Sequence, residues 1–192
     1  YSCDDRYDNI FFGLFARLVR YTAMIIAFTG SSLFVALTSF HTDVLPTKYA
    51  ISLAEMRGNV PFTALTGALL LEFIMELLRE ALLRVPKQIG PAIGIVGAIV
   101  IGQAAIAAGI FSPLLLIIAA TSLLASFAIP DYSLVNPFRV LKFVLLIFTG
   151  TMGFFGFTIF MTFILVELVS LNSFGVPYMA PWAPFNLYDF II

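Results

Sequence analysis

Three glutamates in the stretch LLLEFIMELLREALLR, Glu72, Glu76 and Glu80, recur every four residues, so a helix places them on one stripe. A carboxylate at the centre of a lipid bilayer costs about 2.5–3.5 kcal/mol, so this acidic stripe must face protein, water or the membrane interface. Arg79 lies three residues beyond Glu76 and Arg84 four beyond Glu80, a spacing that lets carboxylate and guanidinium pair along a helix. The stripe could also attract cations to the mouth of a pore.

A second candidate site is the uncharged stretch IVGAIVIGQAAIAAG, residues 95–109, which carries a single amide. Helical spacing places on one face Ala92 and the pore or gate candidates Val96, Ile99, Gln103 and Ile106. This face packs inside one subunit, with Gln103 bonded to a neighbouring helix, or it lines a narrow pore if identical subunits surround an axis. A hydrophobic pore can close by dewetting, without a steric plug.

Glycines recur every three residues in TGTMGFFGF, at Gly150, Gly153 and Gly156. Small residues let helix backbones approach closely in lipid, where dispersion and weak hydrogen bonds then hold the helices together. We therefore expect these glycines to mark a site of helix packing.

Enzyme chemistry is not expected from this sequence. His41 is the single histidine, at the end of an apolar run and close to Asp43, where capping of the membrane interface is a more natural role than metal ligation or base catalysis. The single cysteine, Cys3, has no second thiol for a disulfide or a zinc site. No P-loop, H-E-x-x-H or G-x-S-x-G motif is present in the sequence. The sequence predicts no catalytic residue, no metal site and no cofactor.

The composition indicates a lipid environment. Hydrophobic residues make up 61% of the chain and charged residues 11%, against about 45–50% and 25% in soluble domains. The formal net charge of −1 argues against a nucleic-acid partner, which would need a clustered basic face. We predict an all-α, polytopic helical membrane protein with about 4–5 spanning helices plus one charged interfacial or buried helix.

Charge-free stretches of about 20 residues, long enough to cross a bilayer, locate the predicted spans. The predicted elements are apolar spans over 21–40, 89–110, 113–129 and 143–166, a charged helix over 62–84, and a Pro/aromatic interfacial segment over 172–186. The Ser112-Pro113 pair forms the turn between two of these spans, because proline suits the first turn of a helix. The segment over 172–186 lies on the membrane surface or forms a re-entrant plug.

Basic residues predict the orientation of the spans. The basic clusters are Arg17 with Arg20; Arg79 and Arg84 with Lys87; and Arg139 with Lys142. If the charged helix crosses the membrane, all of these clusters fall on one side, which the positive-inside rule assigns to the cytoplasm together with the N-terminus. If that helix stays at the interface, the clusters split between the two sides. We favour the crossing arrangement, with the N-terminus inside.

Several longer motifs point to a family. TDVLPTKYAISLA, VPF, LREALLRVPKQIG, IVGAIVIGQAAIAAGIFSP and SFGVPYMAPWAP occur in this order, between about residues 15 and 184. In order and spacing they resemble the membrane domain of the A subunit of GerA-type spore germinant receptors. The family's large N-terminal soluble domain is absent from these residues, so we expect the chain to be part of a longer protein.

The resemblance implies a nutrient receptor in the inner membrane of the dormant bacterial spore, which triggers germination. It implies a homo-oligomeric, nutrient-gated ion channel that works with a permease-like B subunit and a lipoprotein C subunit. This favours pore lining by the face that carries Val96, Ile99 and Gln103.

Two alternatives remain. A secondary solute transporter would form its substrate site within one subunit, but such proteins usually show internal repeats, and this sequence has none. A signalling scaffold that does not conduct would transmit a partner's signal without any pore.

Overall fold

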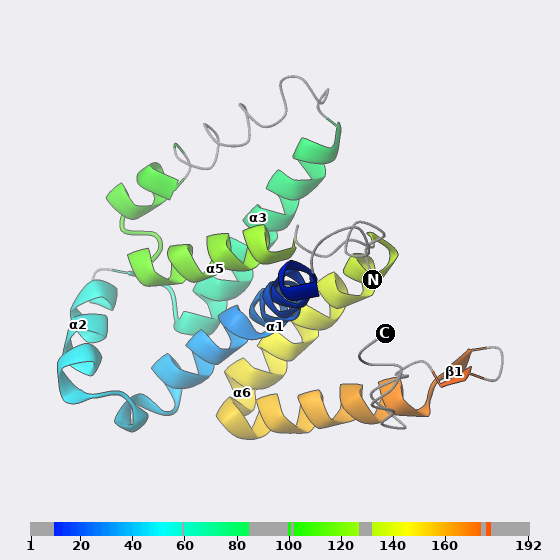
Figure 1. Ribbon diagram of the computed structural model, residues 1–192. Helices are drawn as coiled ribbons and strands as arrows, with labels where there is room; N and C mark the ends of the chain where they lie inside the picture. Colours follow the sequence, from blue (N-terminus) through cyan, green and yellow to red (C-terminus); the bar gives the residue numbers. More distant parts are fainter. Residues whose placement is uncertain are drawn as a thin grey trace.

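The computed structural model describes residues 10–58, 60–84, 100, 102–126, 132–173 and 176–177, and these residues are almost entirely helical (Figure 1). The elements are the helices α1 (Ile10–Ser39), α2 (Thr47–Arg57), α3 (Ala64–Arg84), α5 (Pro113–Ser126) and α6 (Tyr132–Ser170), the short 3-10 helix η2 (Thr42–Val44), and the strands β1 (Asn172–Ser173) and β2 (Val176–Pro177). The two strands form a small antiparallel pair, and residues 102–107 are also helical. The predicted all-α class is confirmed.

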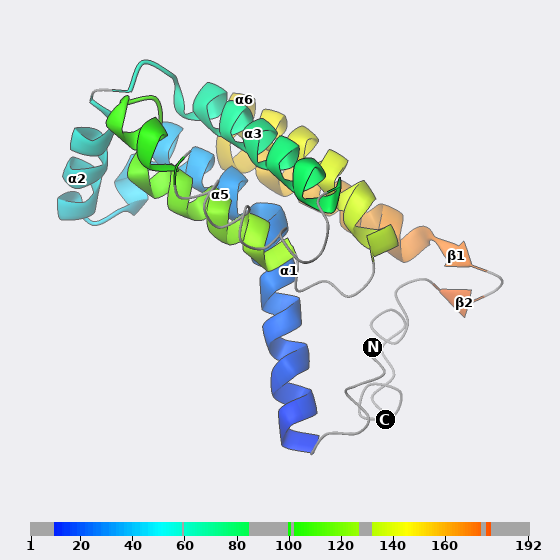
Figure 2. The same ribbon diagram turned by 90° about the horizontal axis from the view of Figure 1, so that it is seen from above.

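Helix α1 is the central element, and α3, α5 and α6 pack around it (Figures 1 and 2). One apolar core joins α1, α3 and α5 through Val35, Leu71 and Leu115, each at most 4% exposed. A second core joins α1 to α6, with Leu145 and Phe160 among its members. The N-terminal part of α1 extends away from the other helices in Figure 2, and its apolar side chains there are exposed.

The turn before α5 is fixed by backbone and side-chain capping. Gly109 has φ of 65°, and the N–H groups of Gly109 and Ile110 donate to the carbonyls of Ile106 and Ala105, the Schellman arrangement that ends a helix. The Ser112 hydroxyl then accepts a bond from the N–H of Leu115, while Pro113 occupies the first position of α5. Proline loses no helical hydrogen bond at this position, so the chain reverses sharply here.

Helix α6 bends at Gly153, where φ is 64° and ψ is −144°. Its two halves diverge in Figure 1, where the first is yellow and the second orange. The sequence predicts one span over 143–166, whereas the structure interrupts that stretch near its middle. Glycine adopts positive φ without the steric cost that a Cβ would bring, and the bend brings this residue against Phe40 and His41.

Within the described part of the chain, two helices are long and apolar enough to cross a membrane, Phe15–Ser39 and Asn136–Ser170. Helix α5 is apolar but shorter, and α3 forms the predicted charged helix. Most of the predicted span over 89–110 lies outside the described residues. Fewer spans are therefore visible than the predicted 4–5, and the polytopic arrangement stays a prediction.

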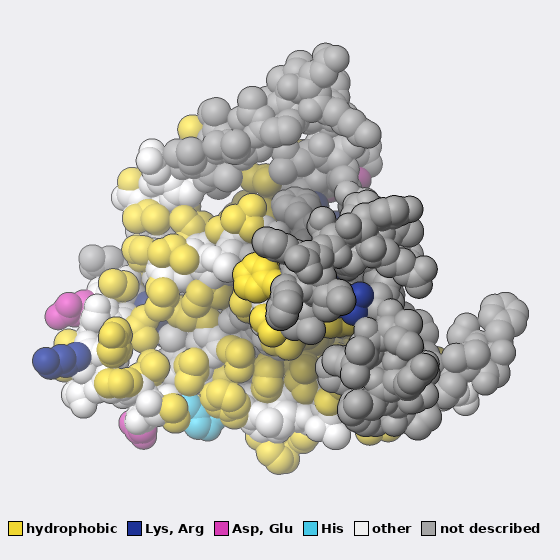
Figure 3. Space-filling model, viewed as in Figure 1, with side chains coloured by type: hydrophobic (Ala, Val, Ile, Leu, Met, Phe, Trp, Pro, Cys, Tyr) yellow, Lys and Arg dark blue, Asp and Glu magenta, His cyan; other side chains and the backbone are white. Residues whose placement is uncertain are grey.

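The described surface is strongly apolar. Most of the side chains that are coloured in Figure 3 are hydrophobic, and charged side chains lie near the left edge, over α2. Large apolar side chains such as Phe155, Phe163 and Leu124 are more than half exposed. Soluble monomers rarely expose apolar patches this extensively, so the surface suits contact with lipid or with other chains.

Candidate functional site

Glu72 of α3 lies at the centre of a buried polar network. Its side chain is only 8% exposed, and its Oε2 atom lies 2.7 Å from Nζ of Lys142 on α6. The hydroxyl of Ser31, on α1, donates to Oε1 of the same carboxylate. One carboxylate thus binds two neighbouring helices, and both of its oxygens have partners.

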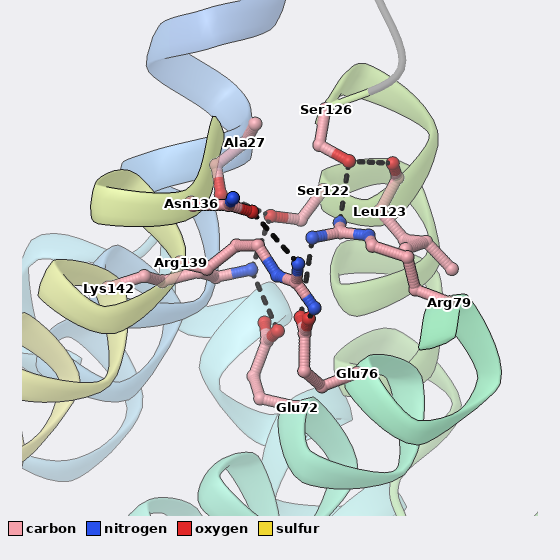
Figure 4. A network of polar contacts seen from close by, with 10 residues as sticks. All are labelled: Ala27, Glu72, Glu76, Arg79, Ser122, Leu123, Ser126, Asn136, Arg139 and Lys142. Atoms are coloured by element: carbon pink, nitrogen blue, oxygen red, sulfur yellow. Dashed lines mark hydrogen bonds and ion pairs between the residues drawn. The ribbon is translucent and has the colours of Figure 1, made fainter. Parts of the chain in front are cut away.

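Lys142 extends this network to α5. Its ammonium also donates to Oγ of Ser122 at 2.8 Å, and the Ser122 hydroxyl donates to the carbonyl of Ala27 on α1 at 2.7 Å. Hydrogen bonds therefore run from α3 through α6 and α5 back to α1. Figure 4 shows these side chains pointing towards one another.

A second group of ion pairs lies about one turn along α3. Glu76 pairs with Arg139 of α6 and, at 3.3 Å, with Nη1 of Arg79 on its own helix. Nη2 of Arg79 donates to the hydroxyl of Ser126 on α5 at 2.6 Å (Figure 4). The Glu76–Arg79 pair is the one that the i, i+3 spacing predicts. The side chain of Arg84 lies outside the described residues, and Glu80 is exposed at the end of the acidic stripe.

These groups surround a cavity of about 40 Å³. Its charged lining consists of the carboxylates of Glu72 and Glu76 and the cations of Arg79, Arg139 and Lys142, and its apolar lining includes Phe28 and Phe138. The space is sufficient for about one ordered water. A buried charge that keeps its partner is tolerated, but removal of one partner costs about 3–5 kcal/mol. These ion pairs and hydrogen bonds can fix the positions of α1, α3, α5 and α6 relative to one another.

Three basic residues of the network belong to the clusters that predict the orientation of the spans. The sequence predicts that Arg79, Arg139 and Lys142 flank the membrane, but all three point inward, to carboxylates of α3 or to serines of α5. Their positive charges are paired with carboxylates inside the chain. The cytoplasmic placement of the N-terminus then depends on the remaining basic residues and stays a prediction.

Two of the four pore candidates, Val96 and Ile99, lie outside the described residues. The other two, Gln103 and Ile106, are both exposed. Two small residues of the same helix face inward: Ala105 is 8% exposed in the core, and a Cβ at Gly102 would lie 3.2 Å from Leu116 of α5, whereas Ala104 is exposed. Gln103 forms no hydrogen bond with any residue that the structure describes.

The three glycines of α6 occupy different environments. A Cβ at Gly150 would clash with the side chain of Leu65 on α3, so this glycine permits close contact between two helices. A Cβ at Gly156 would clash with the carbonyl of Phe148, on the other side of the bend. Gly153 forms the bend itself.

The role of His41 at the membrane interface stays a prediction. Its ring packs edge-on against Phe154, with ring centroids 5.1 Å apart, and its side chain forms no hydrogen bond that caps η2. The bend at Gly153 brings Phe154 to this position, which no local sequence pattern around His41 indicates.

Sequence reasoning finds the acidic stripe but not its partners on other helices. The signal that could have identified them is the helical spacing of polar residues in apolar surroundings: Arg139 with Lys142 on α6, and Ser122 with Ser126 on α5. Polar groups at such positions usually face the interior of a helical bundle in a membrane.

Long apolar helices whose charged side chains turn inward to one another are features of helical membrane proteins. The chain belongs to the family described as Bacillus/Clostridium GerA spore germination protein, which it matches over residues 1–192. This confirms the resemblance seen in the sequence motifs.

Individual relatives agree with this assignment. Spore germination protein KA of Bacillus subtilis (strain 168) is 41% identical over 96% of this chain and 34% of its own length. Spore germination protein A1 of the same organism is 40% identical over 97% of this chain and 39% of its own length. A membrane protein of that organism, YfkQ, is 37% identical over 96% of this chain and 36% of its own length. The chain thus spans little more than a third of these relatives, and no solved structure matches it.

Proposed function

We propose that this chain is the membrane part of an A-type subunit of a nutrient-responsive germinant receptor in the inner membrane of the spore. Copies of the chain form a homo-oligomer around an ion-conducting pore, which opens when nutrient binds to the receptor and so triggers germination. A permease-like B subunit and a lipoprotein C subunit are its partners. Membership of the GerA family supports the role in germination.

The exposed amide of Gln103 is the main observation that supports a pore. The helix around it is otherwise apolar, Gly102 and Ala105 face the chain's own core on another side of the helix, and Gln103 has no partner among the described residues. An amide that faces hydrocarbon loses its hydrogen bonds to water, which is unfavourable. Another copy of the chain, or water in a pore between copies, would restore those bonds.

The acidic stripe has a mechanical role in this proposal. Residues 102–107 pack on α5, and α5 is tied to α3, α6 and α1 through Ser122 and Ser126. A partner that moves α3 or α6 would therefore also move the helix that carries Gln103. Small shifts of packed helices are a common way to switch an interface between two states.

The bend in α6 supports a second candidate. Transporters bind substrates at helices that are interrupted near the middle of the membrane, and α6 is interrupted at Gly153 within an apolar stretch. A secondary solute transporter would need no assembly of copies, and it would move a solute against a gradient. A signalling scaffold would do neither.

Reconstitution of the full-length protein together with its B and C subunits into liposomes separates these functions, with flux measured before and after a nutrient mixture is added. The channel predicts an assembly of several copies and passive cation flux, and it predicts that Gln103→Leu lowers this flux severalfold because the pore loses its polar group. Ala104→Leu is the matched control, since Ala104 is exposed but lies about 100° around the helix from Gln103. A strictly monomeric protein that accumulates a solute would contradict the channel and favour the transporter, whereas no flux at all would favour the scaffold.

A further inference from the structure

A second, larger cavity lies where α1 ends, enclosed by η2, α2 and the segment that leads into α3. It measures about 310 Å³, within the range of small-molecule sites, and most of its lining is apolar, including Leu45, Leu53 and Phe62. Arg57, in the last turn of α2, is the charged residue of this lining. The ionic network described above does not contribute to this cavity.

The guanidinium of Arg57 is only weakly engaged. Its Nη1 donates to the carbonyl of Thr38 at 3.4 Å, which is long for a hydrogen bond. Thr38 lies in the last turn of α1, where carbonyls have no partner within the helix. No carboxylate among the described residues lies within ion-pair distance of Arg57. Most of its five donors are therefore available, and their planar arrangement matches the oxygens of a phosphate or carboxylate.

The surroundings of the cavity resemble the headgroup layer of a membrane. Helix α2 has no buried residue, and it follows the candidate span Phe15–Ser39 after the short η2. Large apolar side chains are exposed around it, Phe40, Val44, Tyr49, Ile51 and Met56. Charged side chains lie among them at this edge of the molecule (Figure 3). Side chains with apolar bodies and polar tips are typical of the boundary between lipid and water.

We propose that this cavity binds the phosphate of a membrane phospholipid, with the phosphate oxygens on Arg57 and the glycerol and upper acyl chain against Leu53 and Phe62. The positive charge of Arg57 attracts a phosphate group. The apolar surface beside it favours a lipid over a free anion, because a free anion would leave that surface exposed to water. The proposal rests on the membrane location of α1 that is part of the proposed function, and it does not depend on the pore.

Native mass spectrometry of the full-length protein in detergent tests this site. The probes are dioctanoyl phosphatidylglycerol, dioctanoylglycerol as the same lipid without phosphate, and inorganic phosphate as a competitor. We expect phosphatidylglycerol to bind at least about tenfold more tightly than dioctanoylglycerol, and Arg57→Gln to remove at least about tenfold of that affinity, since the lost bonds involve charged groups. Lys48→Gln is the matched control on α2, because Lys48 is exposed and does not line the cavity.

A second variant leaves the charge intact. Ala54 lines the cavity and is exposed, so Ala54→Leu fills part of the space and should also weaken binding of phosphatidylglycerol. If Arg57→Gln does not purify as a folded protein, Ala54→Leu decides the question. Equal binding by the wild type and the folded variants would overturn the site. Displacement of the lipid by an equal concentration of inorganic phosphate would identify a soluble phosphate as the occupant and overturn the lipid proposal.

Discussion

Removal of the ammonium of Lys142 is the sharpest test of the buried network. In Lys142→Met, Glu72 keeps its charge at a site where 8% of the side chain is exposed, and it loses the partner at 2.7 Å. An uncompensated buried charge costs about 3–5 kcal/mol. For a chain of 150–250 residues, 1 kcal/mol changes the melting temperature by about 2–4 °C, so we expect a fall of about 6–20 °C.

The measurement is thermal unfolding in detergent, followed by circular dichroism. The double variant Glu72→Leu/Lys142→Met removes both charges, so it should regain much of the lost stability and show a coupling of about 1–3 kcal/mol. Glu80→Gln is the matched control, because Glu80 belongs to the same acidic stripe but is exposed, and it should change stability by less than about 1 kcal/mol. The network does not hold these helices together if Lys142→Met has the same melting temperature as the wild type. The same conclusion follows if the stability losses of Glu72→Leu and Lys142→Met simply add in the double variant.

Adjacent serines of α1 give an independent comparison within the same network. Ser31 and Ser32 are both fully buried, but only the hydroxyl of Ser31 donates to Glu72, while that of Ser32 has no hydrogen-bond partner among the described residues. We expect Ser31→Ala to cost about 1.5–3 kcal/mol, the range for hydrogen bonds to charged groups, and Ser32→Ala to be neutral or slightly stabilising. Equal melting temperatures for the two variants would mean that the bond to Glu72 contributes nothing.

Two further predictions concern α6. Gly153→Ala should destabilise the protein by at least about 1–2 kcal/mol in the same assay, because the residue has φ of 64° and a Cβ would lie 3.0 Å from the ring of Phe40. Gly58→Ala, at φ of −57°, should change stability by less than about 1 kcal/mol, and equal effects at the two sites would contradict the strain at the bend. Gly150→Val should cost about 1–3 kcal/mol through its clash with Leu65, and Leu65→Ala in the same chain should restore part of this loss; no restoration would show that the two helices do not meet at this point.

The elements that follow local rules are those that the sequence predicts. The charged helix over 62–84, the Glu76–Arg79 pair and the turn at Ser112-Pro113 depend on helical spacing and on the backbone preferences of proline, and all three are present. The distribution of polar side chains also indicates that the acidic stripe cannot face lipid.

Features that depend on distant contacts could not be predicted in the same way. Lys142 and Glu72 are 70 residues apart, and they meet only because α3 and α6 pack on the same central helix. The glycine repeat indicates close packing, but repeat spacing cannot show that Gly153 alone adopts positive φ. The contact between His41 and Phe154 could not be predicted either, because the bend at Gly153 brings the two rings together.

Pore lining by Gln103 is the central claim, and cysteine accessibility in liposomes tests it most directly. The background has the other cysteines replaced by serine, and the receptor is reconstituted with its B and C subunits. After the nutrient mixture is added, Gln103→Cys should conduct cations. A charged methanethiosulfonate reagent should then block most of that flux, because the modified side chain fills a narrow pore. Ala104→Cys should remain unblocked. Full conduction by Gln103→Cys after complete modification would contradict the claim and place the conducting path elsewhere.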